Sequence, residues 1–326
     1  MSELTDPEIL EFVRVSEESY PIDANVAPPE EDRRLYRLMF ALFELPRPDG
    51  VTSDDKFIAA AGPTRQIPLR YYSSARADCP SAAILYLHGG GFVVGDLESH
   101  DPTCARLCAD TRLDVVSVDY RLCPEHAYPA ALDDVEASYR HLALSYDRIV
   151  VMGDSAGGNL TAALCRRLFR LGEPQPAGQV LIYPFLGGPQ DRGSFIERAD
   201  APLLRASDCQ HYRQLYAGGD AAALQHNPEF MPLSADDYRG LAPAFAVSAD
   251  LDPLRDDAQL YVERLRAAGV AAEWRNEPQL VHGYLRAISM SRRARASFAA
   301  ICEMARAFAD QSAPIRIGSP QLQKIL

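Results

Sequence analysis

The sequence lacks the features of a secreted, membrane-spanning or nucleic-acid-binding protein. Its first residues contain neither a basic segment nor an apolar one, so we expect no signal peptide. No apolar run reaches the roughly eighteen residues that a membrane span requires. Positive charge is in deficit, with 33 Lys and Arg against 45 Asp and Glu and a formal net charge of −12, which argues against nucleic acid or an anionic membrane as a partner. We therefore expect a soluble, cytoplasmic protein.

Cysteine is sparse, and its spacing is not that of a disulfide framework or a metal site. The chain has 7 cysteines, an odd number without a C-x-x-C pair, which favours reduced thiols. Cys104 and Cys108 lie four residues apart on an expected helix and could share a metal. No histidine pair or second cysteine pair completes such a site, so packing in the core is the favoured interpretation. We expect neither a metal nor an organic cofactor.

The remaining composition is that of a globular protein with a regular alternation of strands and helices. The chain has 326 residues, of which 47% are hydrophobic and 24% charged, enough to bury a large core. Its hydrophobic patterns predict strands at 66–72, 82–87, 113–120, 148–152, 179–183, 243–249 and 271–277. Helices are predicted near 130–145, from the end of the fourth strand to about 171, at 254–268 and from about 285 to 309. This order predicts an α/β fold with a mostly parallel sheet and helices on both faces.

Two segments depart from the alternation. Residues 1–45 are acidic and amphipathic, with a break at Pro28–Pro29, and predict one or two helices. Residues 185–240 contain many glycines and prolines and predict short helices without a strand. Because α/β proteins bind ligands at the carboxyl edge of the sheet, both segments are candidates for a cap over that edge.

A sharp turn between a strand and a helix presents a serine. In Gly153-Asp154-Ser155-Ala156-Gly157 the two glycines leave room for the turn, and the serine at its apex has an exposed hydroxyl in a strained backbone. The following helix points backbone N–H groups at any anion that forms beside it. The pattern predicts that Ser155 is a nucleophile, whereas Asp154 is expected to brace the loop rather than react.

A glycine run directly after a buried strand can stabilise an oxyanion. In His88-Gly89-Gly90-Gly91-Phe92 no Cβ obstructs the backbone N–H groups. We predict that the donors are the N–H groups of Gly90, Gly91 and Ala156. A phosphate-binding loop is the alternative, but it would require a Lys-Ser/Thr ending or a G-x-G-x-x-G spacing, and both are missing. His88 is expected to form a structural hydrogen bond rather than act as a second base.

A serine nucleophile needs a base and an acid that orients the base. In sheet-based serine hydrolases these follow the serine in the order acid, then histidine, and His282 is the only histidine after the strand at 243–249. The acid should come from the loop after that strand. Asp252, held extended before Pro253, is the best candidate, and Asp250 is the reserve. For Asp256 and Asp257, which fall in the following helix, a solvated surface is the favoured interpretation.

Five ordered motifs carry a family resemblance: His88–Phe92, Asp119–Glu125, Gly153–Gly158, Asp252–Asp256 and Val281–Gly283. On these motifs the chain resembles the hormone-sensitive-lipase family of α/β-hydrolase esterases, in its bacterial carboxylesterase and acetyl-esterase branch, from roughly residue 60 to 310. The resemblance implies an α/β-hydrolase fold with Ser155 as nucleophile, Asp252 as acid, His282 as base and an oxyanion hole in the glycine run. Cys123 departs from the usual alanine, a change that affects no catalytic group.

The resemblance also implies a domain plan and a substrate class. Residues 1–45 would form cap helices, and residues 46–326 a catalytic domain with a cap insertion at about 185–240. The expected partner is a small-molecule ester with a short acyl group. Hydrolysis of amides, carbamates or lactones by the same residues is the alternative. A ligand receptor that has lost the catalytic histidine is the rival of another class, disfavoured here because Ser155, Asp252 and His282 are all present. Relatives often form dimers, so a homodimer is implied, although no residue decides it.

Overall fold

The computed structural model of the protein describes residues 3–310 except 21–27, 44, 60–64, 76, 78 and 80. Parts of two predicted segments therefore lie outside the described residues, namely positions 1–2, 21–27 and 44 of the N-terminal segment and positions 60–64, 76, 78, 80 and 311–326 of the catalytic domain. Within the described ranges, no helix combines the length and the apolarity needed to cross a membrane.

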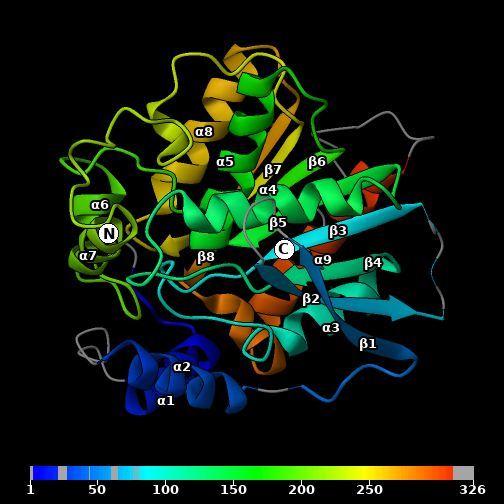
Figure 1. The fold of residues 1–326 in the computed structure, drawn as a ribbon. Coiled ribbons are helices and arrows are strands. Elements are labelled where there is room, and N and C mark those ends of the chain that lie inside the picture. The colour runs from blue at the N-terminus through cyan, green and yellow to red at the C-terminus, as the bar shows by residue number, and fades with distance from the viewer. Residues whose placement is uncertain are drawn as a thin grey trace.

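The centre of the protein is a sheet of eight strands in the order β1-β2-β4-β3-β5-β6-β7-β8 (Figure 1). The strand β1 pairs antiparallel with β2, and β2 with β4, while every pairing from β4 through β3 to β8 is parallel. The bounds are β1 Val51–Ala59, β2 Gln66–Ser74, β3 Ala82–Leu87, β4 Asp114–Val118, β5 Arg148–Asp154, β6 Gly178–Ile182, β7 Ala244–Leu251 and β8 Ala272–Val281. The predicted α/β fold with a mostly parallel sheet is confirmed.

Helices connect the strands and cover both faces of the sheet, and two of them precede it. Their bounds are α1 Pro7–Ser19, α2 Pro29–Ala41, α3 Asp101–Thr111, α4 Ala130–Leu142, α5 Ala156–Leu171, α6 Ser194–Glu197, α7 Ala206–Tyr216, α8 Arg255–Ala267 and α9 Arg292–Ala309, with short 3₁₀ helices η2 Pro232–Ser234 and η3 Tyr284–Ser289. The helices α3 and α9 contact each other on one face, and α4 and α5 contact each other on the opposite face.

The alternation of side chains along the central strands creates two cores. On β3, Ile84 and Tyr86 pack into the core that contains α3 and α9, whereas Ala83 and Leu85 pack into the core that contains α4 and α5. Because successive side chains of a strand point to opposite faces, a strand buried on both sides has to be apolar at every position. All six residues of β3 are buried, which explains the continuous apolar run in the sequence.

The predicted strands are all present, with ends shifted by a few residues, but two expectations need correction. The strand β1 was not predicted, because most of its residues are exposed and polar and it lies at the sheet edge. The long C-terminal helix does not begin near residue 285. It begins at Arg292, because the Ser291 side chain accepts a hydrogen bond from the backbone of Ala294 and caps it there.

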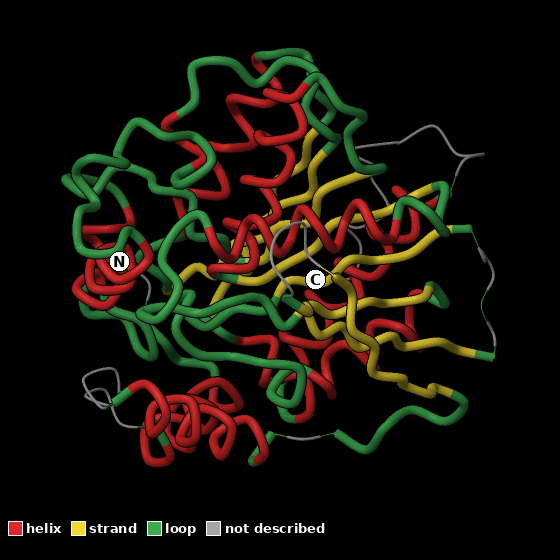
Figure 2. Tube along the Cα trace, viewed as in Figure 1, coloured by secondary structure: helices red, strands yellow, loops and turns green. Residues whose placement is uncertain are grey.

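Helices from the two irregular segments lie at the end of the sheet where the parallel strands finish. Figure 1 shows α1 and α2, drawn in blue, together at this end, with α6 and α7 beside them. Between β6 and β7 the chain contains helices, turns and loops but no strand, as Figure 2 shows by the absence of yellow in that segment. These elements therefore border the space above the serine turn.

Candidate active site

The turn that presents Ser155 depends on close backbone packing. The serine lies between β5 and α5 with φ 53° and ψ −115°, a left-handed conformation that costs a side-chain-bearing residue about 1–3 kcal/mol. A Cβ atom on Gly157 would lie 1.9 Å from the Leu87 carbonyl oxygen, and one on Gly153 would lie 2.4 Å from the Gly157 carbonyl carbon. Both positions must be glycine, because only glycine lets β3, β5 and α5 come this close.

The structure brings together the serine, histidine and aspartate that the sequence selects. His282 Nε2 lies 2.9 Å from Ser155 Oγ, and His282 Nδ1 lies 2.7 Å from Asp252 Oδ2. The other oxygen of Asp252 accepts a hydrogen bond of 2.8 Å from the backbone of Leu254. The Asp252 side chain is fully buried. The three side chains come from the ends of β5, β7 and β8, which are neighbours through β6 in the sheet.

The other candidate acids have different partners. Asp250 accepts a hydrogen bond from Asn276, and Asp256 accepts one from the backbone of Ser194. Asp257 is not a solvated surface residue, because it is buried and accepts a 2.7 Å hydrogen bond from the backbone of Leu186. Burial raises the pKa of Asp257 to about 7. Asp256 and Asp257 therefore attach α8 to the segment after β6.

The three predicted oxyanion donors lie around the serine. Gly90, Gly91 and Ala156 line the same cavity as Ser155. Ala156 is the first residue of α5, and the first N–H groups of a helix have no partner within it. Gly91 has φ +61°, and a Cβ atom there would lie 2.6 Å from the ring of Tyr212. A side chain at this position would therefore collide with α7.

Two polar residues beside the serine brace the glycine loop. Asp154 Oδ1 accepts hydrogen bonds from the backbone of Gly89 at 3.0 Å and from Tyr86 at 2.8 Å. Burial tends to raise the pKa of Asp154, but the neighbouring His100 and hydrogen bonds such as that from Tyr86 hold it below its usual value. The ring of His88 is buried, and its Nδ1 lies 2.8 Å from the Gly89 carbonyl oxygen. Burial lowers the pKa of His88 to about 4, so this histidine is neutral and structural.

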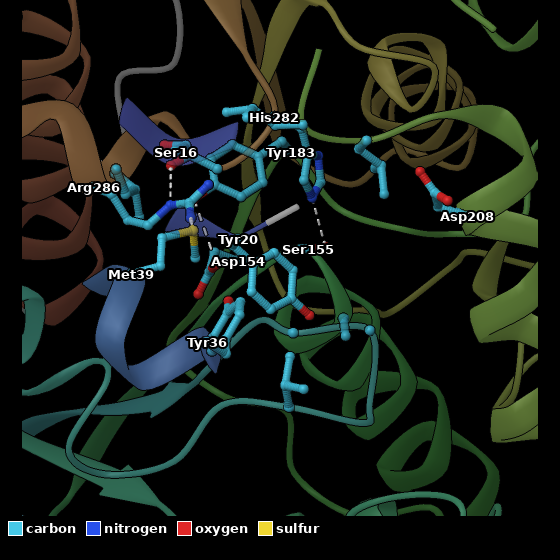
Figure 3. A pocket seen from close by; sticks show the side chains of 18 of the residues that line it. Ser16, Tyr20, Tyr36, Met39, Asp154, Ser155, Tyr183, Asp208, His282 and Arg286 are labelled. Carbon is cyan, nitrogen blue, oxygen red and sulfur yellow. Dashed lines mark hydrogen bonds between the residues drawn. The ribbon is translucent and has the colours of Figure 1, made fainter. Parts of the chain in front are cut away.

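The cavity above Ser155 is closed by residues of the N-terminal helices and of the segment after β6. Tyr20 of the α1 end, Tyr36 of α2 and Tyr212 of α7 line it together with His282, and Figure 3 shows Tyr36 and His282 around the serine. Tyr183 and Phe185, which follow β6, also line the cavity. Phe92, by contrast, stacks on Tyr216 at 3.7 Å, and Tyr284 shares a hydrogen bond with Ser297.

Contacts that the sequence did not reveal attach α2 and the segment after β6 to the site. Arg33 of α2 donates to the carbonyl oxygens of Val93 and Cys123, both at 2.9 Å, and pairs with Glu125. Asn159 of α5 donates to the carbonyl oxygens of Phe185 and Phe230. An arginine on a surface helix and an asparagine near a helix start carry no sequence signal for such distant partners.

Two charged residues in the segment after β4 form structural ion pairs. Glu125 binds Arg33, and Arg121 pairs with Asp134 of α4 at 2.9 Å. Cys104 and Cys108 are buried on α3. Among the residues that the structure describes, no three His, Cys, Asp or Glu side chains are grouped to hold a metal ion.

A serine on a strand-to-helix turn, with a histidine and an aspartate behind it at the carboxyl ends of parallel strands, defines the class of α/β hydrolases. The family model for the alpha/beta hydrolase fold matches residues 84–286. The chain belongs to this family, in its hormone-sensitive-lipase-like branch.

Several relatives carry names that state an activity. The chain is 42% identical to Esterase LipI of Mycobacterium tuberculosis over 241 residues, which cover 70% of this chain and 74% of that protein. It is 37% identical to the ethyl acetate hydrolase of Pseudomonas putida over 230 residues, covering 68% and 72%. Among solved structures, an ester hydrolase from the metagenome of Lake Arreo, EH1AB1, in complex with a bipyridine phosphonate derivative, is 30% identical, with a TM-score of 0.83 and coverage of 92% and 98%.

Proposed function

We propose that this chain is a serine carboxylesterase that hydrolyses small, short-acyl carboxylic esters through an acyl-enzyme on Ser155. The observation that carries the proposal is the continuous hydrogen-bond chain from Ser155 Oγ through His282 to Asp252. The serine end of this chain lies in a cavity that Gly90 and Gly91 also line. The names of the relatives LipI and ethyl acetate hydrolase support the same reaction class.

Acylation of the serine is the first half of the proposed reaction. His282 Nε2 takes the proton of Ser155 Oγ, which attacks the ester carbonyl carbon. The N–H groups of Gly90, Gly91 and Ala156 bind the oxyanion, and each such donor typically lowers the barrier by about 2.7–4 kcal/mol. The alcohol then leaves with the proton from His282. Asp252 fixes the ring tautomer and stabilises the imidazolium.

Deacylation repeats the proton transfers with water in place of the alcohol. His282 takes a proton from water, which attacks the acyl carbon on Ser155. Collapse of the second oxyanion releases the carboxylic acid and returns the proton to the serine. These steps use only side chains and backbone groups of this chain.

The preference for short acyl groups rests on the shape of the cavity. Its volume is about 130 Å³, and its walls include Tyr36 and Tyr212 from the elements above the sheet. A pocket of this size limits the length of the acyl chain, and the relative named ethyl acetate hydrolase fits this limit. Amides, carbamates and lactones are the alternative substrates on the same residues.

Labelling by a fluorophosphonate tests the nucleophile, with Ser155→Ala as the matched variant. We expect one label per wild-type chain, none on the variant, and hydrolysis of 4-nitrophenyl acetate only by the wild type. A ligand receptor of the same fold would show neither label nor turnover. Wild-type-like hydrolysis by Ser155→Ala would contradict the assignment. A series from acetyl to dodecanoyl esters then measures the acyl preference.

The domain plan, location and assembly form the last part of the proposal. We propose that residues 1–45 and about 185–240 act as the cap of a catalytic domain formed by 46–326. The cysteines of the described chain are free, which suits the reducing cytoplasm. A homodimer stays a prediction, for which sedimentation of the purified protein is the measurement.

A further inference from the structure

An arginine that forms no ion pair with any residue that the structure describes lines the cavity that contains Ser155. Arg286 belongs to η3, four residues after His282, and is partly buried in the cavity wall. Figure 3 shows its guanidinium beside Met39, in the same pocket as Tyr183 and His282. Guanidinium groups keep their proton in proteins, so a full positive charge lies in the pocket.

The close contacts of Arg286 are all with neutral groups. Nε donates to the Gly283 carbonyl oxygen at 3.2 Å, and Nη1 donates to Met39 Sδ, a weak acceptor. The guanidinium also lies 5.3 Å from the ring centres of Phe12 and Phe40. In the part of the chain that the structure describes, no carboxylate forms an ion pair with it.

Acidic groups near the cavity have other partners or positions. The negative charge of Asp154, in the same cavity wall, acts on Arg286 and favours its charged form, but its Oδ1 accepts hydrogen bonds from Tyr86 and the Gly89 backbone and forms no ion pair with Arg286. Asp208 accepts from Arg205. Glu17 lines the cavity but is exposed. Burial lowers the pKa of Arg286, as expected for a cation removed from water. A buried charge without a partner is costly, which favours binding of an anion from outside.

A second polar group in the same wall lacks a partner. Ser16 of α1 is 1% exposed, and its Oγ has no hydrogen-bond partner among the described residues although Ser16 lines the cavity. Buried hydroxyl groups are nearly always hydrogen-bonded. Ser16 and Arg286 therefore present unused donors to the same pocket.

The position of Arg286 relative to His282 indicates which part of the substrate it faces. A Cβ atom on Gly283, the residue after His282, would lie 2.7 Å from Arg286 Nη2. Since the leaving alcohol takes its proton from His282, the alcohol part of an ester lies on the histidine side of the pocket.

We propose that Arg286 binds a carboxylate in the alcohol part of the substrate, so that the preferred substrates are acyl esters of hydroxy acids. This inference rests on the proposed esterase function. Water adds across the ester C–O bond, and the products are a short-chain acid and a hydroxy acid. Arg286 is then a specificity-determining residue, and binding of the substrate supplies its ion-pair partner.

The test compares each carboxylate ester with its own neutral amide. The substrates are 3-acetoxypropanoate, 4-acetoxybutanoate and 5-acetoxypentanoate, with their primary amides, and acetate release gives kcat/KM. The three chain lengths cover a range of distances between the ester bond at Ser155 and the carboxylate at Arg286. For the wild type we expect at least one acid to exceed its amide by tenfold or more. An acid-to-amide ratio at or below one for all three pairs overturns the inference.

The variant Arg286→Gln should reduce that ratio at least tenfold. The ratio is used because it cancels any general loss of activity. A merely structural role for Arg286 would lower both rates equally and leave the ratio unchanged. An unchanged ratio in the variant therefore overturns the inference. Arg295→Gln is the matched control, since Arg295 is exposed and binds only backbone carbonyls at the end of η3; its ratio should stay that of the wild type.

Three outcomes are distinguished when an expected result is not obtained. If Arg286→Gln does not fold, the wild-type ratios still decide the inference. If the wild type hydrolyses 4-nitrophenyl acetate but prefers every amide, only the role of Arg286 fails. If 4-nitrophenyl acetate is not hydrolysed and Ser155 is not labelled, the proposed function fails and the inference with it.

Discussion

The imidazole Nδ1 of His282 lies 2.7 Å from Oδ2 of Asp252, and the second oxygen of that carboxylate is held by the backbone of Leu254. The aspartate is fully buried. This geometry fixes the orientation of the histidine ring and leaves its Nε2 directed at Ser155.

Replacing the buried acid should reduce turnover strongly. In Asp252→Asn the amide can stabilise the other tautomer of His282, so we expect kcat for 4-nitrophenyl acetate to fall by about 10³–10⁴ with little change in KM. The control is Asp250→Asn, two residues away, whose side chain accepts a hydrogen bond from Asn276. An equal loss in both variants would assign the effect to the loop and not to the acid.

A methyl group on the glycine loop should displace an oxyanion donor. In Gly91→Ala the new Cβ would lie 2.6 Å from the Tyr212 ring, so the loop must shift, and we expect kcat to fall by about 10²–10³. The double variant Gly91→Ala/Tyr212→Ala should recover part of the loss, because the collision is removed.

Gly172→Ala controls for backbone strain in the Gly91 experiment. Gly172 has φ +69°, and a Cβ there would meet nothing within 4 Å. We expect this variant to keep its turnover. No recovery in the double variant would argue against the collision as the cause.

Loss of Arg33 should loosen the attachment of α2 to the site. Arg33→Gln removes hydrogen bonds to the carbonyl oxygens of Val93 and Cys123, and we expect the free energy of unfolding to fall by about 1–3 kcal/mol. Urea unfolding measures this change. Arg34→Gln is the matched control, because Arg34 is exposed and pairs only with Glu31 on the same helix, a contact typically worth about 0.2–0.5 kcal/mol. Equal losses would contradict the prediction.

Acid should destabilise the fold through His88. Burial lowers its pKa to about 4 from the 6.5 of a free histidine, so the unfolded chain binds more protons than the folded one between these values. Stability is therefore full above pH 6.5 and is lost as the pH falls toward 4, with an upper limit on the order of 3 kcal/mol.

Unfolding free energies of His88→Gln measured across this pH range test the assignment. We expect a smaller slope than in the wild type, whatever the stability of the variant at neutral pH. The control is His141→Gln, which replaces an exposed histidine and should keep the wild-type slope. A wild-type slope in His88→Gln would show that other groups cause the acid effect.

The sequence predicted the strands that are buried on both faces and did not predict the edge strand. The run 82–87 is apolar at every position because both of its faces are covered, and this leaves a signal in the sequence. The strand β1 has six successive exposed residues, so its composition is that of a loop. Its place in the sheet depends on pairing with β2, a long-range contact that no local pattern records.

The same contrast applies to the acidic residues after β7. The sequence singled out Asp252 because its place in the chain order and its neighbour Pro253 are local information. It misjudged Asp257 as solvated, because the helix pattern does not show that Leu186, far away in the chain, donates to it. The side-chain role of a helical aspartate is decided by what packs against the helix.

By itself the sequence determined the reaction machinery, because the serine turn, the glycine loop and the order of acid and histidine each require particular residue types at fixed local spacings. Only the tertiary structure decided what surrounds that machinery. Arg33, Asn159 and Arg286 occupy ordinary helical or loop positions in the sequence, and their roles arise from contacts with residues that lie far away in the chain or line a common cavity. Bond cleavage depends on local backbone geometry, whereas selectivity depends on which distant segments the fold brings to the pocket.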